Sequence, residues 1–350
     1  MGGPRNTSMK TLRISQPMTF ESAPLEISEL PRPQPGPGQV LVKIEASGLC
    51  TTDRDLITGH TPIAQLPRIL GHQGAGKVET LGEGVYDFNV GDRVVSTIDV
   101  VCGDCPYCRR GRPNLCQSLK RIGFELDGSH AEYAVVPQAN LIHLPDTVPF
   151  DQGCILADAV ASMYHALVAR GQMKAGDKVV LLGIGGVGIQ GVQIARLGGA
   201  EVLVTSRQPA RLESALQLGA NHAVNPEKED VMQAVSEFTG GEGADIVMDA
   251  IGLENTVQMG VEMARPGGKI ILFGNIQPTF TASFTDIFMP EKDILGSRAN
   301  TKEALLAVTD LVADGKLTPL VSRQFPLSEF KKAIAEIDNN TLVGRAVFIP

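Results

Sequence analysis

The sequence lacks clustered positive charge, a long apolar run and an apolar leader. Its formal net charge is −8, and no stripe of Lys and Arg interleaved with aromatic residues appears, which argues against nucleic-acid binding. No apolar run approaches the roughly 18 residues that a membrane-spanning helix needs. The opening MGGPRNTSMKTLRI lacks the apolar core of a signal peptide. We therefore expect a cytoplasmic protein with neither a membrane nor a nucleic acid as partner.

Length and composition indicate an ordinary globular protein. The 350 residues suggest two domains, and 43% of them are hydrophobic and 20% charged. The first eight residues are expected to be a disordered leader, with Met9 as the natural start. Because a cytoplasmic setting disfavours disulfides, the six cysteines require explanation as buried thiols or metal ligands.

The pattern of apolar residues changes near residue 155. Before it, short alternating runs such as QVLVKIEA and HAEYAVVP predict an irregular all-β domain. After it, KVVLLG, EVLVTS and ADIVMDAIG each precede a helical stretch, which predicts a parallel, doubly wound sheet. Residues 300–350 carry two helical segments and the strand GRAVFIP, and we expect them to return to the first domain. The prediction is an α/β fold, with one domain over 1–157 and 297–350 and a Rossmann domain over 158–296.

The stretch VVLLGIGGVG matches the dinucleotide-binding pattern G-x-G-x-x-G. It contains Gly183, Gly185, Gly186, Val187 and Gly188, directly after a predicted strand and at the start of a predicted helix. Such glycines allow a tight turn and close approach to a pyrophosphate, whose charge the helix N-terminus favours. A tight turn without a ligand is the alternative, but the β-α-β context favours a dinucleotide.

The end of the next predicted strand favours NADP(H) over NAD(H). An acidic residue there would bind the ribose hydroxyls of NAD, but VLVTSRQPARL has none. Ser206 leaves room for a 2′-phosphate, and Arg207 can pair with it through a planar, charge-assisted contact. The alternative is that Arg207 is a solvated surface charge.

Four cysteines lie together in CGDCPYCRRGRPNLC. Cys102, Cys105, Cys108 and Cys116 have the spacing C-x2-C-x2-C-x7-C, which can close a tetrahedral shell of thiolates around Zn²⁺. A full shell leaves no place for water, so the metal would be structural. Disulfides are disfavoured by compartment and crowding, and an iron–sulfur cluster fits the spacing less well than zinc.

Two further residues, Cys50 in SGLCTTDRD and His72 in LGHQGAGKVETLGEG, are each more often core residues than ligands. With the four-cysteine lobe, AEYAVVP, GIGGVG and GRAVF, however, residues 9–350 resemble the zinc-dependent medium-chain alcohol dehydrogenases. The family motif G-H-E-x-x-G-x5-G matches Gly71, His72, Gly76 and Gly82. The resemblance implies that the first domain is GroES-like and that Cys50 and His72 are ligands of a catalytic zinc.

The third ligand implied by the resemblance is Asp158, in CILADAVASMYHAL. Branches of the family that use Asp here are similar also in having an SR dipeptide at the NADP-selecting strand end, as at Ser206 and Arg207. Alternatively, Asp158 caps the following helix, or Cys154, one helical turn earlier, is the ligand. Three ligands leave a fourth position open, which is typical of a catalytic zinc that lowers the pKa of an alcohol or polarises a carbonyl.

The resemblance also implies a route for the substrate proton. Thr52 occupies the family's hydroxyl relay position, although a turn residue bonding its own backbone is the alternative. Asp53 is expected to be a structural hydrogen-bond acceptor. Many relatives continue the relay with a His five residues after the Cys. Here Asp55 stands in that place, so Asp55 or water would complete it.

The same resemblance suggests roles for Arg345 and Ile98 but none for His130. Arg345 in VGRAVF is expected to approach the cofactor pyrophosphate, with a surface Arg on a strand edge as the alternative. Ile98 falls where relatives often have an aromatic ring in the substrate pocket, which would make this pocket wider. His130 has no evident partner and is expected to be an ordinary structural or surface residue.

Gln73 departs from the family motif, which usually has Glu. Zn²⁺ with one thiolate, one carboxylate and a neutral imidazole has no net charge, and a Glu at 73 would make its surroundings negative. The family Glu is thought to approach zinc during ligand exchange, so we expect Gln73 to slow exchange or make it substrate-dependent.

The sequence thus predicts an NADP(H)-dependent, zinc-dependent oxidoreductase acting on an alcohol or a carbonyl compound, with two Zn²⁺ ions per chain and a homodimeric or homotetrameric state. The alternatives are an NAD-dependent polyol or alcohol dehydrogenase, a zinc-free enoyl or quinone reductase on the same fold, and a non-catalytic protein of lens-crystallin type. Metal content distinguishes two zincs from one or none.

Overall fold

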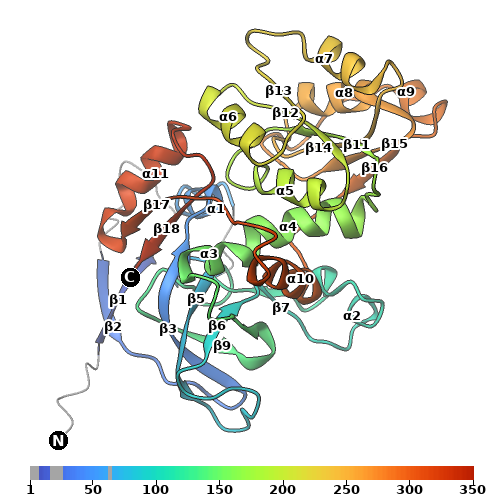
Figure 1. The fold of residues 1–350 in the computed structure, drawn as a ribbon. Coiled ribbons are helices and arrows are strands. Elements are labelled where there is room, and N and C mark those ends of the chain that lie inside the picture. Colours follow the sequence, from blue (N-terminus) through green and yellow to red (C-terminus); the bar gives the residue numbers. More distant parts are fainter. Residues whose placement is uncertain (1–7, 16–26, 62–64) are drawn as a thin grey trace, which may run out of the picture. The chain divides into compact units, whose positions relative to one another are not determined.

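The structure, a computed structural model, describes residues 8–15, 27–61 and 65–350 (Figure 1). The chain folds into two compact units. Unit 1 comprises Met1–Asp158 and Thr301–Pro350, and unit 2 comprises Ala159–Asn300. Of the predicted leader, residues 1–7 lie outside the described residues, whereas Ser8 and Met9 begin the first strand. Within the described part of the chain, no helix is both long and apolar enough to cross a membrane.

Unit 1 is built mainly from short strands, as the alternating runs predict. A seven-stranded sheet has the order β10-β6-β5-β3-β18-β17, with β9 paired to β3. A three-stranded sheet has the order β2-β1-β4, and β7 pairs with β8. The strands are β1 (Ser8–Ile14), β2 (Ile27–Pro31), β3 (Gln39–Gly48), β4 (Arg68–Ile69), β5 (Gly74–Leu81), β6 (Arg93–Ser96), β7 (Asp99–Val100), β8 (Lys120–Arg121), β9 (Tyr133–Pro137), β10 (Leu141–His143), β17 (Val321–Pro326) and β18 (Arg345–Ile349).

Helices and turns of unit 1 connect these strands. They are α1 (Thr51–Ile57), α2 (Pro106–Arg109), η1 (Pro113–Leu115), η2 (Gln138–Asn140), α3 (Phe150–Ile155), α10 (Lys302–Ala313), η5 (Leu327–Glu329) and α11 (Phe330–Asp338). Residues 301–350 join unit 1 because β18 pairs antiparallel with β3. Phe330 and Phe348 from this segment pack in one apolar core with Leu12, Leu49 and Leu56. The predicted return of the chain to its first domain is therefore observed.

Unit 2 is a parallel six-stranded sheet of order β13-β12-β11-β14-β15-β16. This is the doubly wound dinucleotide-binding order, with its switch point between β11 and β14. Helix α4 contacts α5, and α8 contacts both α7 and α9, giving two groups of helices around the sheet. The elements are α4 (Ala161–Tyr164), η4 (His165–Arg170), β11 (Lys178–Leu182), α5 (Gln190–Leu197), β12 (Glu201–Thr205), α6 (Pro209–Gln217), β13 (His222–Val224), α7 (Val231–Thr239), β14 (Ala244–Asp249), α8 (Glu254–Met263), β15 (Ala264–Leu272), α9 (Phe284–Phe288) and β16 (Asp293–Gly296).

The helical stretch from α3 through η4 is irregular. Between α3 and α4 the segment η3 (Leu156–Val160) has π-helical hydrogen bonding, and η4 is a second π-helical segment. Such π turns are rare and occur frequently at functional sites. Asp158 lies in the middle of the first one.

Candidate active site

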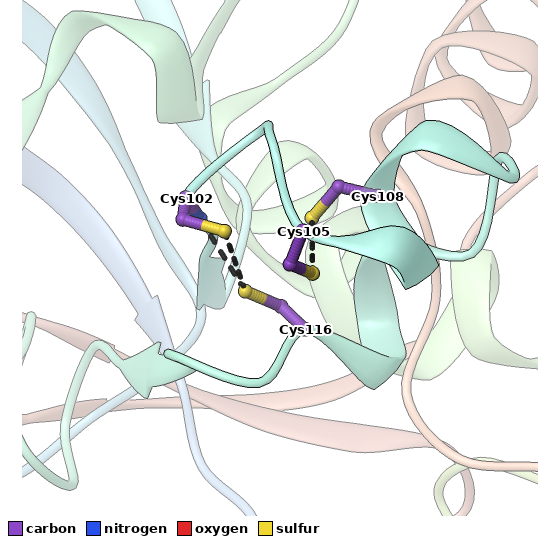
Figure 2. Close-up of side chains that lie close together, drawn as sticks. All are labelled: Cys102, Cys105, Cys108 and Cys116. Carbon is purple, nitrogen blue, oxygen red and sulfur yellow. Dashed lines mark hydrogen bonds between the residues drawn. The ribbon is translucent and has the colours of Figure 1, made fainter.

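The four-cysteine lobe has little apolar support of its own. Helix α2, which carries Cys108, has no buried residue, and η1 buries only Asn114. Figure 2 shows the four sulfur atoms facing one another across the loop. All four lie within 4.8 Å of one another, so the lobe is held at a cluster of thiols and not by a core.

The sulfur spacing fits a metal ion. The Cys105 and Cys108 sulfurs are 3.5 Å apart, as are those of Cys102 and Cys116. A disulfide would require about 2.05 Å. A tetrahedron with Zn–S bonds of about 2.3 Å has edges of about 3.8 Å. Backbone N–H groups of Cys108 and Gln117 lower the pKa of Cys105 to about 6, which favours a thiolate there.

Sheet register brings the ends of three strands of unit 1 together. Ser47 near the end of β3 pairs with Gly74 at the start of β5, so the residues just before β5 lie beside those just after β3. On the other side of β3, Gly48 pairs with Val347 of β18. Cys50, which follows β3, therefore has the segment before β5 and the start of β18 as neighbours.

Cys50 is buried at the N-terminus of α1. It is the N-cap residue, with extended backbone angles, and its N–H donates to Oδ2 of Asp53 over 2.8 Å. Its sulfur lies 3.4 Å from Oγ1 of Thr52. Burial raises the pKa of the Cys50 thiol, but the charge of Arg345 and a hydrogen bond with His72 outweigh burial and leave the pKa below its usual value.

His72 and Asp158 face Cys50. One donor atom from each of the three residues lies within 4.8 Å of the others. His72 Nε2 is 3.7 Å from Asp158 Oδ2, and a tetrahedral zinc with bonds of about 2.0–2.2 Å places such atoms about 3.4 Å apart. The donor set of thiolate, imidazole and carboxylate is one that zinc accepts, so these residues fit the ion.

Cys154 is not part of this group. Its sulfur donates to the carbonyl of Asp151 over 3.2 Å, within its own helix. Burial, and then the charge of Asp151, raise the pKa of the Cys154 thiol well above its usual value. Because Asp158, and not Cys154, converges with Cys50 and His72, the geometry favours Asp158 as the third ligand.

Asp53 links the residues around the site. It is fully buried, and its Oδ1 lies 3.7 Å from Nδ1 of His72 while its Oδ2 lies 3.5 Å from Nε2 of His130. Burial raises the pKa of the Asp53 carboxyl, but the two histidines outweigh burial and lower it far below its usual range. Asp53 is thus an anion that faces Nδ1 of His72, whereas Asp158 faces Nε2 of the same ring.

Arg345 lies at this site, on the first residue of β18. It is buried, and its Nη2 donates to Oδ2 of Asp158 over 2.9 Å. Burial lowers the pKa of the guanidinium, but the charges of Cys50 and Asp158 outweigh burial and raise the pKa. Arg345 is therefore a fixed cation beside two acidic donors. The expectation that it also approaches a pyrophosphate stays a prediction.

Several buried polar atoms at the site have no hydrogen-bond partner among the described residues. They are Asp53 Oδ1, His72 Nδ1, Gln73 Oε1, His130 Nε2 and Arg345 Nε. Gln73 is fully buried, and its Nε2 is 3.3 Å from His72 Nε2. Because buried polar atoms are nearly always paired, such a concentration is typical of a site that holds an ion.

Other predicted residues lie in the same unit with different contacts. Asp55 accepts a hydrogen bond from Arg54 Nε over 3.1 Å, and Ile98 is buried between β6 and β7. Their roles in a proton relay and a substrate pocket stay predictions. Sequence reasoning missed His130, which is fully buried beside Asp53, and Phe124, whose ring lies 5.6 Å from that of His72. No local sequence pattern distinguishes either residue, since their partners lie more than fifty positions away.

The glycine turn of unit 2 has the geometry of a pyrophosphate cradle. Gly183 has φ +83°, a conformation that glycine adopts without strain, and a Cβ on Gly188 would come within 2.1 Å of the Gly183 carbonyl. At Gly185, by contrast, an added Cβ would meet no atom within 4 Å. These are the three roles expected of a dinucleotide fingerprint: a tight turn, an open face and close packing.

The end of β12 carries two arginines. Arg207 is exposed after Ser206, whose Oγ accepts from the N–H of Gln208 over 3.2 Å. Arg211 follows in the first turn of α6, a turn that contains no acidic residue. Burial lowers the pKa of Arg211, and the charge of Arg207 lowers it further. Two cations near a helix N-terminus repel each other and oppose the helix dipole, so an anion there would relieve both effects. Sequence reasoning missed Arg211, which lies four positions after Arg207 at the start of the following helix.

Family models match both units. Residues 36–146 match the alcohol dehydrogenase GroES-like domain, and residues 186–314 match the zinc-binding dehydrogenase domain. A sorbitol dehydrogenase of Halalkalibacterium halodurans is 35% identical over 325 residues, which cover 91% of this chain and 93% of that protein.

Solved structures are similar over the whole chain. An NAD-dependent alcohol dehydrogenase is 30% identical with a TM-score of 0.92, over 97% of this chain and 99% of that one. A zinc-binding dehydrogenase from Sinorhizobium meliloti bound to NADP is 33% identical with a TM-score of 0.88, over 99% of this chain and all of that one. These two relatives share the fold, but one is described as NAD-dependent and the other is bound to NADP.

Proposed function

The chain belongs to the zinc-type medium-chain alcohol dehydrogenase family of oxidoreductases, and from that premise we propose that it is an NADP(H)-dependent enzyme that interconverts an alcohol and its aldehyde or ketone. The observation that carries the proposal is the convergence of Cys50, His72 and Asp158 in unit 1. That convergence argues against the zinc-free and non-catalytic alternatives, for which these three donors have no use.

We propose that these three residues hold a catalytic zinc and that the four-cysteine lobe holds a structural one. Bound there, the catalytic ion would supply a Lewis acid that lowers the pKa of an alcohol or polarises a carbonyl. Asp53 orients the His72 ring from behind, and the Thr52 hydroxyl beside Cys50 would take up the proton that the substrate releases while passing its own proton to Asp55 or water. The cofactor would carry the hydride.

Charge balance gives a reason for Gln73. The charges of Cys50 thiolate, Asp158, Asp53 and Arg345 cancel that of a divalent ion, with His72 neutral. A carboxylate at position 73, beside His72 Nε2, would make this buried site negative and weaken a Lewis acid in it. The amide is a neutral neighbour, which supports the view that ligand exchange is slower here or depends on the substrate.

The proposal for NADP(H) rests on the end of β12. Ser206 offers no carboxylate to ribose hydroxyls, and Arg207 and Arg211 together present two cations suited to a 2′-phosphate. The competing reading, an NAD-dependent polyol or alcohol dehydrogenase, is the one that the names of several relatives favour.

We also propose a cytoplasmic homodimer or homotetramer. The edge strand β16 of unit 2 is preceded by a group of exposed apolar side chains: Ile276, Phe284, Phe288 and Met289. An unpaired strand edge beside apolar surface favours association between chains. Five of the seven proposed metal ligands are cysteines, and reduced thiols suit a reducing compartment.

The deciding experiment is a panel of alcohols, polyols, aldehydes and ketones assayed with NADP(H) and with NAD(H). We expect turnover with NADP(H) to exceed that with NAD(H). Arg211→Ala should lower kcat/KM for NADP(H) about 10- to 100-fold, the value of one charge-assisted hydrogen bond, and leave NAD(H) unchanged. Arg265→Ala, which removes an exposed arginine that pairs with Asp245, is the matched control. Equal use of both cofactors would refute the NADP(H) assignment.

A further inference from the structure

His130 is buried in a position that packing alone does not explain. Its side chain has no solvent exposure, and its ring lies edge-on against Phe348, with centroids 5.0 Å apart. Both ring nitrogens nevertheless face polar groups. Nδ1 is 2.8 Å from the hydroxyl of Ser47, and Nε2 is 3.5 Å from Oδ2 of Asp53. Any buried imidazole needs polar partners, and here one of the two is Asp53, which itself contacts Cys50 and His72.

These contacts form a continuous polar chain that leads to the proposed zinc ligands. Ser129 Oγ is 2.8 Å from Ser47 Oγ, and Ser47 contacts His130 in turn. Beyond His130, Asp53 accepts from the N–H of Cys50 through Oδ2 and faces Nδ1 of His72 through Oδ1. Nε2 of His130 faces the Asp53 carboxylate at 3.5 Å, a polar contact without hydrogen-bond geometry.

The backbone of His130 also supports the His72 segment from behind. Its N–H donates to the carbonyl of Leu70 over 2.8 Å, and the N–H of Ser129 donates to the carbonyl of Gly71. A Cβ on Gly71 would come within 2.6 Å of both the N and the Nδ1 of His130. Gly71 precedes His72 directly and has φ +93°, so the ring of His130 lies against the residue that sets the direction of His72.

We infer that His130 is a positioning residue for the proposed catalytic zinc, acting through Asp53 on the His72 ring and the Cys50 backbone. The inference rests on the proposed function, because it concerns the ion that Cys50, His72 and Asp158 would hold. A partner that touches a ligand and not the metal, as Asp53 does here, fixes the direction of the ligand and contributes about 10- to 100-fold to metal affinity, and His130 holds that partner. His130 thus extends the site by one further layer of polar contacts.

The test is the rate at which each zinc passes to a chelator, with Co²⁺ absorption as a second readout. We expect His130→Phe to release the catalytic zinc about 10- to 100-fold faster than wild type and to change the Co²⁺ bands of that site, while the structural zinc stays bound. Phe330→Leu removes a ring that contacts His130 but no polar group, and is the matched control. His130→Gln keeps a donor and should restore part of the retention.

The outcomes separate the two proposals. Wild-type protein with a single zinc per chain would refute the proposed function. If wild type holds two zincs and His130→Phe releases neither of them faster, only the role of His130 is refuted. The same holds if Phe330→Leu accelerates the release of the catalytic zinc as much as His130→Phe does. If His130→Phe does not fold, zinc release is measured on Ser47→Ala instead, because this substitution removes the hydroxyl that contacts Nδ1 of His130. Faster release of the catalytic zinc supports the inference, and release at the wild-type rate refutes it.

Discussion

The two candidate metal centres of this chain are built in opposite ways. The four cysteines lie between residues 102 and 116, on a loop and a helix with almost no buried side chains. Cys50, His72 and Asp158 come from three distant segments and are packed among buried aromatic and charged residues. In the first centre the ion would hold the protein together, whereas in the second the protein is already folded around the donors.

The surroundings of the donors differ as well. Around Cys50, a second layer of Asp53, Arg345 and His130 contacts the donors or one another. Around the lobe, the contacts of the sulfurs are mainly with each other and with backbone N–H groups. A closed shell of thiolates needs no further control, whereas a site with an open position must have the direction of each donor fixed by its neighbours.

The largest effect should come from breaking the lobe. Cys105→Ser removes a sulfur whose pKa is lowered to about 6, and we expect zinc content to fall by about one ion per chain, with protease cleavage appearing between residues 102 and 116. Metal analysis and limited proteolysis measure both. Cys154→Ala, which changes a buried thiol outside both centres, should leave two zincs. Retention of both ions in Cys105→Ser would show that the lobe does not depend on metal.

A smaller structural effect but a clear catalytic one is expected from Asp158→Asn. The amide is a weaker zinc ligand, but its oxygen can still accept from Arg345, so kcat should fall by about 100-fold or more while the melting temperature and the lobe zinc change little. Steady-state kinetics and calorimetry measure the two. Cys154→Ala again serves as control. If Cys154→Ala lost activity and Asp158→Asn kept it, the third ligand would be Cys154.

The smallest effect is expected from Gln73→Glu, which adds one negative charge beside His72. We expect turnover, or the exchange rate of the catalytic zinc, to change about two- to tenfold, because the Gln73 amide lies 3.3 Å from Nε2 of His72. The lobe zinc should not change, because Gln73 belongs to the other centre. Stopped-flow kinetics and zinc exchange report both quantities. Unchanged turnover together with unchanged zinc retention would remove any role for the amide.

The same contrast explains what the sequence could predict. The α/β architecture follows from periodicity, because period-2 runs and βαβ alternation are local properties, and the structure confirms both units. The four-cysteine cluster follows from spacing within fifteen residues. The pairing of Cys50 with His72 and Asp158 required resemblance to a family, since nothing local links residues 22 and 86 positions apart.

The missed residues show where local reasoning ends. His130 and Arg211 acquire their significance from partners that only the register of strands or the start of a helix brings near. The bond of Arg345 to Asp158 was not expected, and it forms because β18 pairs with β3 and carries Arg345 beside Cys50. The approach of Arg345 to a pyrophosphate stays a prediction. The contacts of His130 and Arg345 depend on long-range sheet pairing, which composition and motif do not encode.

The π turn at Leu156–Val160 makes the reactive centre sensitive to chain length as well as to residue identity. A π turn amounts to one extra residue within a helix. The other four residues of this turn, Leu156, Ala157, Ala159 and Val160, are fully buried, while the Asp158 carboxylate lies close to the donor atoms of Cys50 and His72. Deleting one residue before it would swing the carboxylate about 100° around the helix axis. A natural variant with such a deletion would still contain Cys50, His72 and this Asp in its sequence. The carboxylate would point away from the other two donors, however, and the site would be lost.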